Sequence, residues 1–297
     1  MKYHTPVLLQ EVIKIFDPKS GEKFIDATVG GGGHTFEILK REGKILGIDR
    51  DPEAVKYIKN QFHPSTGQSK FQIDRDLILV NDNFAKIATI AKDHGFEKVD
   101  GILFDLGVSF HQLEAAQRGF SFEKSGPLDM RMDPNLTLRA YDLINNFDRR
   151  RLNEIFKTYG QEKLSWSIAG AICSTRQIEP IKSTTDLASI VQEIYREYGK
   201  RTRLHPATKT FLALRIVVNS ELLNLEDSLP QTVDLLEKGG RLVVVSFHSL
   251  EDGIVKRFFK REPKLKVVTP KPIGPKIREI LENPRSRSAK LRAAQKL

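Results

Sequence analysis

The stretch FIDATVGGGGH, residues 24–34, decides the fold that the sequence predicts. It begins with an apolar pair typical of a buried strand and passes through Asp26 into four consecutive glycines. The residues that follow, 34–39, have the apolar spacing of a helix. A strand, a glycine-rich turn and a helix form the first half of a nucleotide-binding βαβ unit, because glycine lets the backbone approach a ligand and the helix start offers unpaired N–H groups.

The second half of this unit follows at the expected distance. Residues 44–48, KILGI, predict the next strand, and Asp49 follows it nineteen residues after Gly30. An acid at that place can accept both hydroxyls of a ribose. The sequence lacks the third glycine of a dinucleotide fingerprint, since Thr35 and Phe36 stand there, and it lacks the lysine of a P-loop. A ribose site without a phosphate site indicates S-adenosylmethionine, and a surface turn that binds nothing remains the alternative.

Composition indicates a globular chain with a polyanionic partner. The 297 residues are 39% hydrophobic and carry a net charge of +10, with a pI of about 9.5, a surplus that favours nucleic acid as a partner. The single cysteine, Cys173, excludes an internal disulfide and a cysteine-based zinc cluster. No apolar run has the length of a membrane span and the N-terminus has no signal-peptide pattern, so we expect a soluble, cytoplasmic protein without a membrane contact.

Strand and helix patterns also alternate in the rest of the chain, before and after residues 113–205. Three more strands are predicted at 76–80, 99–104 and 241–247, the last after a turn at Gly239-Gly240. A single long helix is expected over 207–225. The segment after residue 263 is rich in proline and basic residues.

Between these parts the alternation stops. Helical patterns dominate residues 113–205, at 140–146, 151–159, 164–174 and 185–198. We therefore predict an α/β domain formed by 1–112 and 206–297, with a mostly helical domain inserted at 113–205.

Several motifs together resemble one family. They include DATVGGGGH (26–34), ILGIDRDPEA (45–54), GILFDLGVS (101–109), HPATKTF (205–211), GGRLVVVSFHSLED (239–252) and NPRSRSAKLR (283–292). The chain resembles the bacterial 16S ribosomal RNA cytosine-N4 methyltransferases along nearly its whole length. The resemblance implies a Rossmann-like class I S-adenosylmethionine-dependent methyltransferase fold with a helical insertion that recognises RNA. It also implies methylation of the N4 amine of a cytidine in the decoding centre, within the assembled small ribosomal subunit.

The resemblance also implies a set of site residues. The family's cofactor contacts correspond here to Gly32, Gly33, His34, Asp49, Phe84, Asp105 and Gln112. Two places depart from the family pattern. Gly31 stands where many members carry arginine, and Phe110-His111 replaces the commoner Ser-Pro.

The chemistry of an N4 amine suggests which residues are catalytic. The lone pair of this amine is delocalised into the ring, so the protein must position it and supply an acceptor. Asp105 and Ser109 follow the fourth predicted strand, where related DNA enzymes place their acceptor, although the motif itself differs. No residue spacing indicates a metal site.

For some residues the sequence leaves two interpretations of their role open. Phe84 could meet the adenine or only pack in the core, and His248 could act in the site or hold a loop. Phe120 and Phe122 could stack on an extruded base or anchor their own segment. The basic clusters 149–151, 200–203 and 285–292 could contact RNA phosphates or form solvated faces.

Two alternatives to the RNA methyltransferase remain. One is a methyltransferase that acts on a protein or small molecule, and the other is a non-catalytic ribosome-assembly factor that binds RNA. The basic composition argues against the first, and the intact cofactor motifs argue against the second. The sequence leaves a homodimer open.

Overall fold

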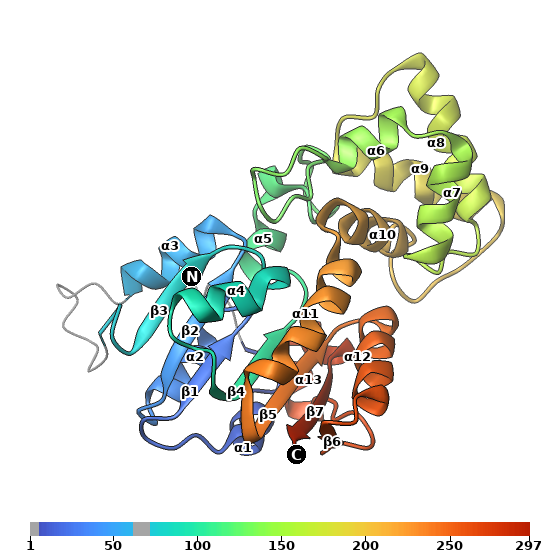
Figure 1. Cartoon of the computed structure of the whole chain (residues 1–297). Coiled ribbons are helices and arrows are strands. Elements are labelled where there is room, and N and C mark those ends of the chain that lie inside the picture. The colour runs from blue at the N-terminus through green and yellow to red at the C-terminus, as the bar shows by residue number, and fades with distance from the viewer. Residues whose placement is uncertain (1–5, 62–71) are drawn as a thin grey trace. The chain divides into compact units, whose positions relative to one another are not determined.

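The structure is a computed structural model that describes residues 6–61 and 72–297 (Figure 1). The chain forms two compact units, Met1–Ser109 with Leu222–Leu297, and Phe110–Glu221. The second unit starts slightly earlier and ends later than the expected insertion at 113–205. A helix at 208–219 therefore lies in the inserted unit and not in the α/β unit.

The first unit is built on a twisted sheet whose strand order, in the part of the chain described, is β3-β2-β1-β4-β5-β7-β6. Strands β1 to β5 are parallel, whereas β7 runs antiparallel to both of its neighbours. The order reverses between β1 and β4, and ligands bind at the carboxyl ends of the strands beside such a reversal. The strands are β1 (Lys23–Asp26), β2 (Lys44–Asp49), β3 (Leu77–Asn81), β4 (Val99–Asp105), β5 (Leu236–Ser246), β6 (Leu265–Val267) and β7 (Lys290–Lys296).

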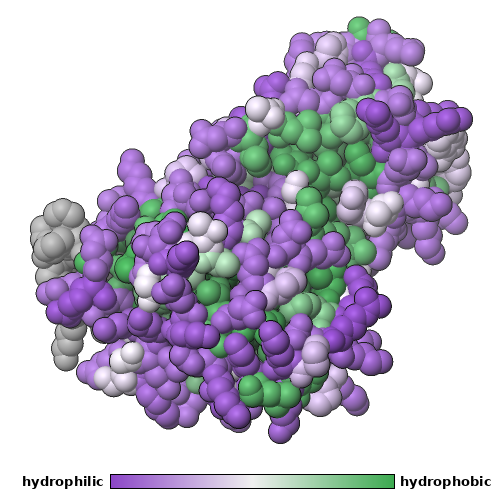
Figure 2. All heavy atoms as spheres, in the orientation of Figure 1, coloured by the Kyte–Doolittle hydropathy of each residue, from purple (hydrophilic) through white to green (hydrophobic). Residues whose placement is uncertain are grey.

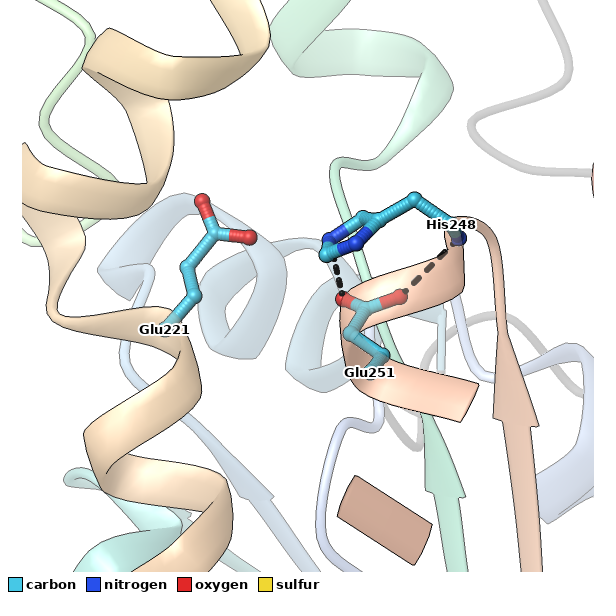
Figure 3. Close-up of side chains that lie close together, drawn as sticks. All are labelled: Glu221, His248 and Glu251. Atoms are coloured by element: carbon cyan, nitrogen blue, oxygen red, sulfur yellow. Dashed lines mark hydrogen bonds and ion pairs between the residues drawn. The ribbon is translucent and has the colours of Figure 1, made fainter. Parts of the chain in front are cut away.

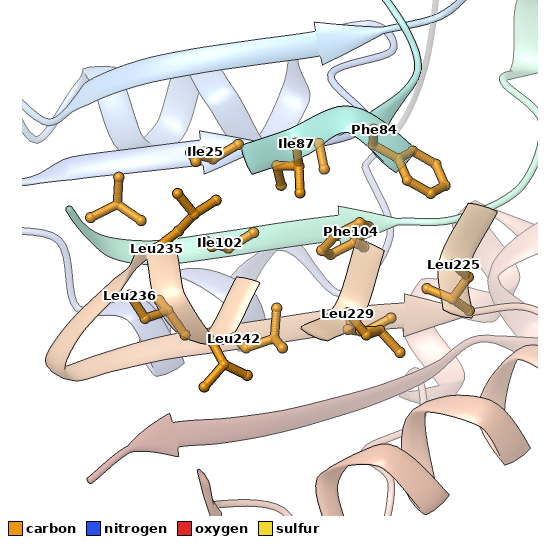
Figure 4. Close-up of a cluster of buried hydrophobic side chains, with 14 of the residues drawn as sticks. Ile25, Phe84, Ile87, Ile102, Phe104, Leu225, Leu229, Leu235, Leu236 and Leu242 are labelled. Carbon is orange, nitrogen blue, oxygen red and sulfur yellow. The ribbon is translucent and has the colours of Figure 1, made fainter. Parts of the chain in front are cut away.

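Helices cover both faces of this sheet. They include α1 (Leu9–Phe16), α2 (Gly33–Leu39), α3 (Pro52–Gln61), α4 (Ile87–Asp93), α11 (Glu221–Leu235), α12 (Ser249–Arg261) and α13 (Ile277–Glu282). Successive strand residues point to opposite faces, so a strand buried on both faces is apolar at every position. Ile102 and Phe104 of β4 pack with α4, α11 and α12 (Figure 4), while Leu103 packs with α1, α2 and α3.

The second unit is helical, as the patterns predicted. Its helices are α5 (Phe110–Glu114), α6 (Ala140–Asn146), α7 (Arg149–Thr158), α8 (Ser165–Ile178), α9 (Thr184–Glu197) and α10 (Thr208–Asn219). Side-chain caps explain two of the starts. Asp148 accepts the amide of Arg151 at 2.9 Å before α7, and Ser183 accepts the amide of Asp186 at 3.1 Å before α9.

The expected single helix at 207–225 is wrong, because the chain breaks it at Ser220. This residue has a φ of 50°, in the left-handed region, and separates α10 from α11. Asn219, beside it, donates to the carbonyl of Met130 at 2.7 Å and accepts the amide of Met132 at 2.8 Å. The break thus depends on contacts with a distant segment. Residues 207–225 contain no glycine or proline that would predict it.

The C-terminal region also differs from expectation. Strand β5 begins at Leu236, so Gly239-Gly240 lies inside it, where the register with β4 shifts. The basic tail returns to the sheet as β6 and β7. Arg292 is buried there and pairs with Asp252 at 2.6 Å. One cation of the 285–292 cluster is therefore structural and does not face solvent.

Hydrophilic side chains cover most of the face drawn in Figure 2, with hydrophobic patches among them. Among residues 6–61 and 72–297, no helix has both the length and the hydropathy needed to cross a bilayer.

Candidate cofactor site

The glycine-rich turn connects the carboxyl end of β1 to the start of α2. Gly32 has a φ of 78°, a left-handed conformation that favours glycine. A Cβ atom at this position would lie 2.6 Å from the ring of Phe36. The amide of Gly32 donates to the carbonyl of Val29 at 2.7 Å, which closes the turn. The turn therefore requires glycine at position 32 for both conformation and space.

Asp49, at the carboxyl end of β2, stabilises this turn through hydrogen bonds to backbone amides. One carboxylate oxygen accepts the amide of Gly30 at 2.8 Å, and the other accepts the amide of Asp51 at 2.9 Å. Burial raises the pKa of Asp49 to about 6, although the two backbone hydrogen bonds oppose the increase. Since an ionised carboxylate has about four acceptor positions, each oxygen can still accept a ribose hydroxyl.

Asp26, at the end of β1, is a second buried carboxylate. It accepts the hydroxyl of Thr35 at 2.7 Å and the amide of Thr28 at 3.2 Å. Burial, with smaller contributions from the charges of Asp105 and Asp49, raises the pKa of Asp26 to about 7, although hydrogen bonds from Thr35 and Thr28 oppose the increase. Three acids at neighbouring strand ends favour a cationic ligand, because positive charge stabilises their ionised forms. The sulfonium and ammonium groups of S-adenosylmethionine meet this requirement.

Asp105, at the end of β4, lies beside the same turn. Its amide donates to the hydroxyl oxygen of Thr28 at 2.6 Å, and its carboxylate lies 3.6 Å from Nδ1 of His34. Nε2 of His34 lies 3.1 Å from the carbonyl oxygen of Val7, and since a carbonyl only accepts, this nitrogen carries a proton. The imidazole is therefore buried between Val7 and Asp105, on the side of the turn opposite to solvent.

The other expected site residues lie in different surroundings. Phe84 is buried and packs edge to face on Phe104, with ring centroids 5.4 Å apart. This contact favours the interpretation that Phe84 packs in the core. Ser109 is the last residue of the first unit, whereas Gln112 lies in α5 of the second. The structure thus brings together the glycine turn, His34, Asp49 and Asp105 within the first unit.

Sequence reasoning missed three contributors to this arrangement. Asp26, Thr28 and Thr35 connect the turn to β4 and α2 through the hydrogen bonds described above. Asp26 could have been found, because an acid directly after a buried strand faces the ligand edge of the sheet. The two threonines carry no such signal.

His248 caps helix α12. Oε1 of Glu251 lies 3.2 Å from Nε2 of the imidazole, and its other oxygen accepts the His248 amide at 3.4 Å (Figure 3). That second oxygen also accepts the amide of Phe247 at 2.9 Å. The Glu251 carboxylate thus holds the backbone at the start of α12, whereas neither imidazole nitrogen of His248 has a hydrogen-bond partner within residues 6–61 and 72–297, so these contacts do not decide between the two alternatives for its side chain. Glu221, also drawn in Figure 3, forms an ion pair with Arg215 of its own unit at 2.8 Å.

The aromatic residues expected near a base also have partners. Phe122 stacks on His205 with centroids 4.5 Å apart and meets Phe211 edge on at 4.9 Å. Phe120 is buried. The contacts of both side chains favour anchoring of their own segment.

The raised pKa of Asp26 gives a prediction about stability. Between about pH 4 and pH 7 the native state binds a proton that the unfolded state releases, so the free energy of unfolding should fall as pH rises through this window. Asp26→Asn removes the charge and should flatten this slope, with a gain of about 1–3 kcal/mol at pH 8. Urea unfolding of the cofactor-free protein at pH 5 and pH 8 measures both effects. The exposed Asp17→Asn is the control, and an unchanged slope in Asp26→Asn would contradict the assignment.

The parallel sheet, its glycine turn and the acids at the strand ends define a class I S-adenosylmethionine-dependent methyltransferase. The chain belongs to the MraW methylase family, whose model matches residues 1–297. The expected fold, enzyme class and cofactor are thereby confirmed.

Individual relatives cover the whole chain. A protein of Thermomicrobium roseum named "Ribosomal RNA small subunit methyltransferase H" is 44% identical, over 99% of this chain and 94% of its own. A protein of Persephonella marina with the same name is 44% identical over 100% of both chains. The solved structure of an rRNA methylase from Streptococcus thermophilus has a TM-score of 0.43 and 11% identity, over 96% of each chain, which is too distant to support an inference about this chain.

Proposed function

We propose that the protein methylates the N4 amine of a cytidine in the decoding centre of 16S ribosomal RNA, with S-adenosylmethionine as the methyl donor. The observation that carries this proposal is the group of carboxylates, Asp26, Asp49 and Asp105, at the ends of the adjacent parallel strands β1, β2 and β4, beside the reversal point of the sheet. The names of the relatives support the RNA substrate. The net charge of +10 suits a polyanion of that kind.

Each residue of the turn has a role in this proposal. Asp49 accepts the ribose hydroxyls while it holds Gly30, so that the cofactor site and the turn are shaped by one carboxylate. The backbone of Gly32, Gly33 and His34 approaches the cofactor from the start of α2. Phe84 follows the end of β3 and packs on its core side, and the resemblance to the family also assigns a cofactor contact to Gln112.

The transfer itself needs an acceptor for the amine. When bound, S-adenosylmethionine supplies an electrophilic methyl carbon. Asp105 accepts a hydrogen bond from N4, draws its lone pair out of conjugation and receives the proton that the amine loses; Ser109 offers a second acceptor four residues on. Positioning of the amine contributes more than the proton transfer, about 7–11 kcal/mol in well-oriented systems.

In this proposal the second unit and the basic C-terminal segment bind the RNA. Cations at 149–151, 200–203 and 285–287 supply phosphate contacts, while Arg292 is excluded by its ion pair. The reaction places the protein in the cytoplasm with the small ribosomal subunit. Sedimentation of the purified chain decides between a monomer and a homodimer.

Nucleoside mass spectrometry tests the activity directly. Small subunits from cells that lack this protein, incubated with the protein and cofactor, should gain N4-methylcytidine in their RNA, and the omission of cofactor should abolish the gain. Radioactive methyl groups found only in protein or small-molecule fractions would establish the first alternative. Subunit binding without any methyl transfer or cofactor binding would establish the assembly factor.

A further inference from the structure

Two half-exposed aromatic residues lie on neighbouring helices of the second unit and are linked through Ser167. Trp166, at the start of α8, is 49% exposed, and Tyr198, just after α9, is 52% exposed. The hydroxyl of Tyr198 lies 2.8 Å from the hydroxyl oxygen of Ser167, the residue after Trp166. We call these two side chains the aromatic platform. Exposure of such large rings is costly in water, so a surface that presents two of them suits a flat ligand.

Arg149 covers one face of the tryptophan. Its guanidinium carbon lies 4.2 Å from the centroid of the Trp166 ring, and its Nε and NH2 donate to the carbonyl of Trp166 at 3.3 and 3.2 Å. This stacking orients the ring from one side. It leaves the exposed half of the side chain for a second partner.

Gly170 makes room for that arginine. It lies four residues after Trp166, on the same face of α8, and a Cβ atom there would come within 2.8 Å of the guanidinium carbon and NH2 of Arg149. Glycine inside a helix lowers its stability relative to alanine. Glycine at this position leaves the guanidinium of Arg149 in place on the tryptophan, whereas a larger residue would make the end of the flexible Arg149 side chain shift.

Cations without carboxylate partners lie on the segments that carry the platform or contact it. Arg149 and Arg150 start α7, and Lys200, Arg201 and Arg203 follow Tyr198 within five residues. The structure gives none of these five an ion pair with any residue in the ranges 6–61 and 72–297. Flat rings beside unpaired cations are the combination that binds bases and phosphates of an unpaired nucleic acid strand.

We propose that the aromatic platform stacks on an unpaired base of the substrate RNA while the surrounding cations bind its backbone. The proposal rests on the proposed RNA methyltransferase function and adds a contact that the cofactor site does not include. A protein partner is less suitable, because Arg149 stacks on one ring and three cations follow the other within five residues, and a phosphate chain carries a negative charge at every nucleotide.

Trp166 is the only tryptophan of the chain, so its fluorescence reports on the platform alone. The full-length protein is titrated with a single-stranded RNA octamer and, in parallel, with duplex RNA of the same length. We expect saturable quenching by the single strand, because a stacked base quenches indole emission. The duplex, whose bases are already stacked on one another, should bind through its phosphates with little quenching. Equal quenching by both, or RNA binding with no quenching, would overturn the proposal.

Substitutions separate stacking from charge. Trp166→Ala should weaken binding of the single strand about tenfold or more, whereas Trp166→Phe should stay within about threefold of the wild type. Ile178→Ala, at the other exposed end of α8, is the matched control and should change nothing. Arg150→Gln should reduce the salt dependence of binding by about one unit and leave the quenching at saturation intact. Equal affinities of Trp166→Ala and Trp166→Phe would refute stacking.

Methylation assays distinguish this proposal from the activity itself. Trp166→Ala should raise KM for small subunits and leave cofactor affinity and the saturated rate near those of the wild type. No N4-methylcytidine with the wild-type protein would refute the proposed function, whatever the fluorescence shows. An affinity loss in Trp166→Ala for intact subunits but not for protein-free RNA would assign the platform to a ribosomal protein and overturn the proposal.

Discussion

Asp105→Asn is expected to lower the saturated rate of methyl transfer by about 10²-fold. Asparagine has nearly the same size and keeps one side-chain acceptor oxygen, and the backbone amide of residue 105 can still donate to the Thr28 hydroxyl because the backbone is unchanged. What is lost is the negative charge that draws the amine out of conjugation and takes up its proton. Because this interaction strengthens in the transition state, its loss appears in the rate and not only in binding.

Single-turnover methylation of under-methylated small subunits at saturating cofactor measures the effect. Ser109→Ala is the matched control, since it removes the other acceptor that follows β4. If Asp105 only stabilises the bound cofactor, the variant will show weaker cofactor binding with an almost unchanged saturated rate. A wild-type rate in Asp105→Asn, together with a slow Ser109→Ala, would move the acceptor role to Ser109.

Asp49→Ala is expected to weaken S-adenosylmethionine binding by about 1.5–3 kcal/mol, roughly ten- to a hundredfold. The change removes the carboxylate that we propose accepts the ribose hydroxyls and that accepts two backbone amides, those of Gly30 and Asp51. The turn should therefore loosen as the ribose contact is lost. Asp49→Asn keeps one acceptor oxygen and should fall between the wild type and the alanine variant.

Titration calorimetry of each variant with the cofactor gives the affinities. The pH dependence provides a second check. The pKa of Asp49 is raised to about 6, so as pH falls through that value the carboxylate gains a proton, loses acceptor capacity, and cofactor affinity should decrease. Calorimetry that shows wild-type affinity in Asp49→Ala would remove this residue from the site.

The alternation of strand and helix and the place of the glycine turn were predictable because their signals are local. Two buried strands, the turn between them and Asp49 lie within a single stretch of the chain, and each is marked by apolar runs or glycine. The helices of the inserted unit were predictable for the same reason. The cofactor and substrate classes depended on motifs that resemble a family, and the family is confirmed by a match over the whole chain.

The contacts between distant residues that complete the cofactor site were not predictable from local patterns. Thr28 meets Asp105 at a separation of 77 residues, and the imidazole of His34 turns under the loop to Val7. Whether a charged residue is buried also depends on distant partners. Arg292 resembles its basic neighbours in the sequence, yet its ion pair with Asp252 takes it out of solvent.

The sequence by itself determined the order of the elements, the glycine turn with Asp49 after the next strand, and the helical nature of the insertion, because periodicity and turn residues act over a few positions. Only the tertiary structure decided the insertion of β7 between β5 and β6, the break at Ser220 and the stacking of Arg149 over Gly170 onto Trp166. Each of these depends on pairing between segments far apart in the chain, and such pairing leaves no pattern in either segment alone.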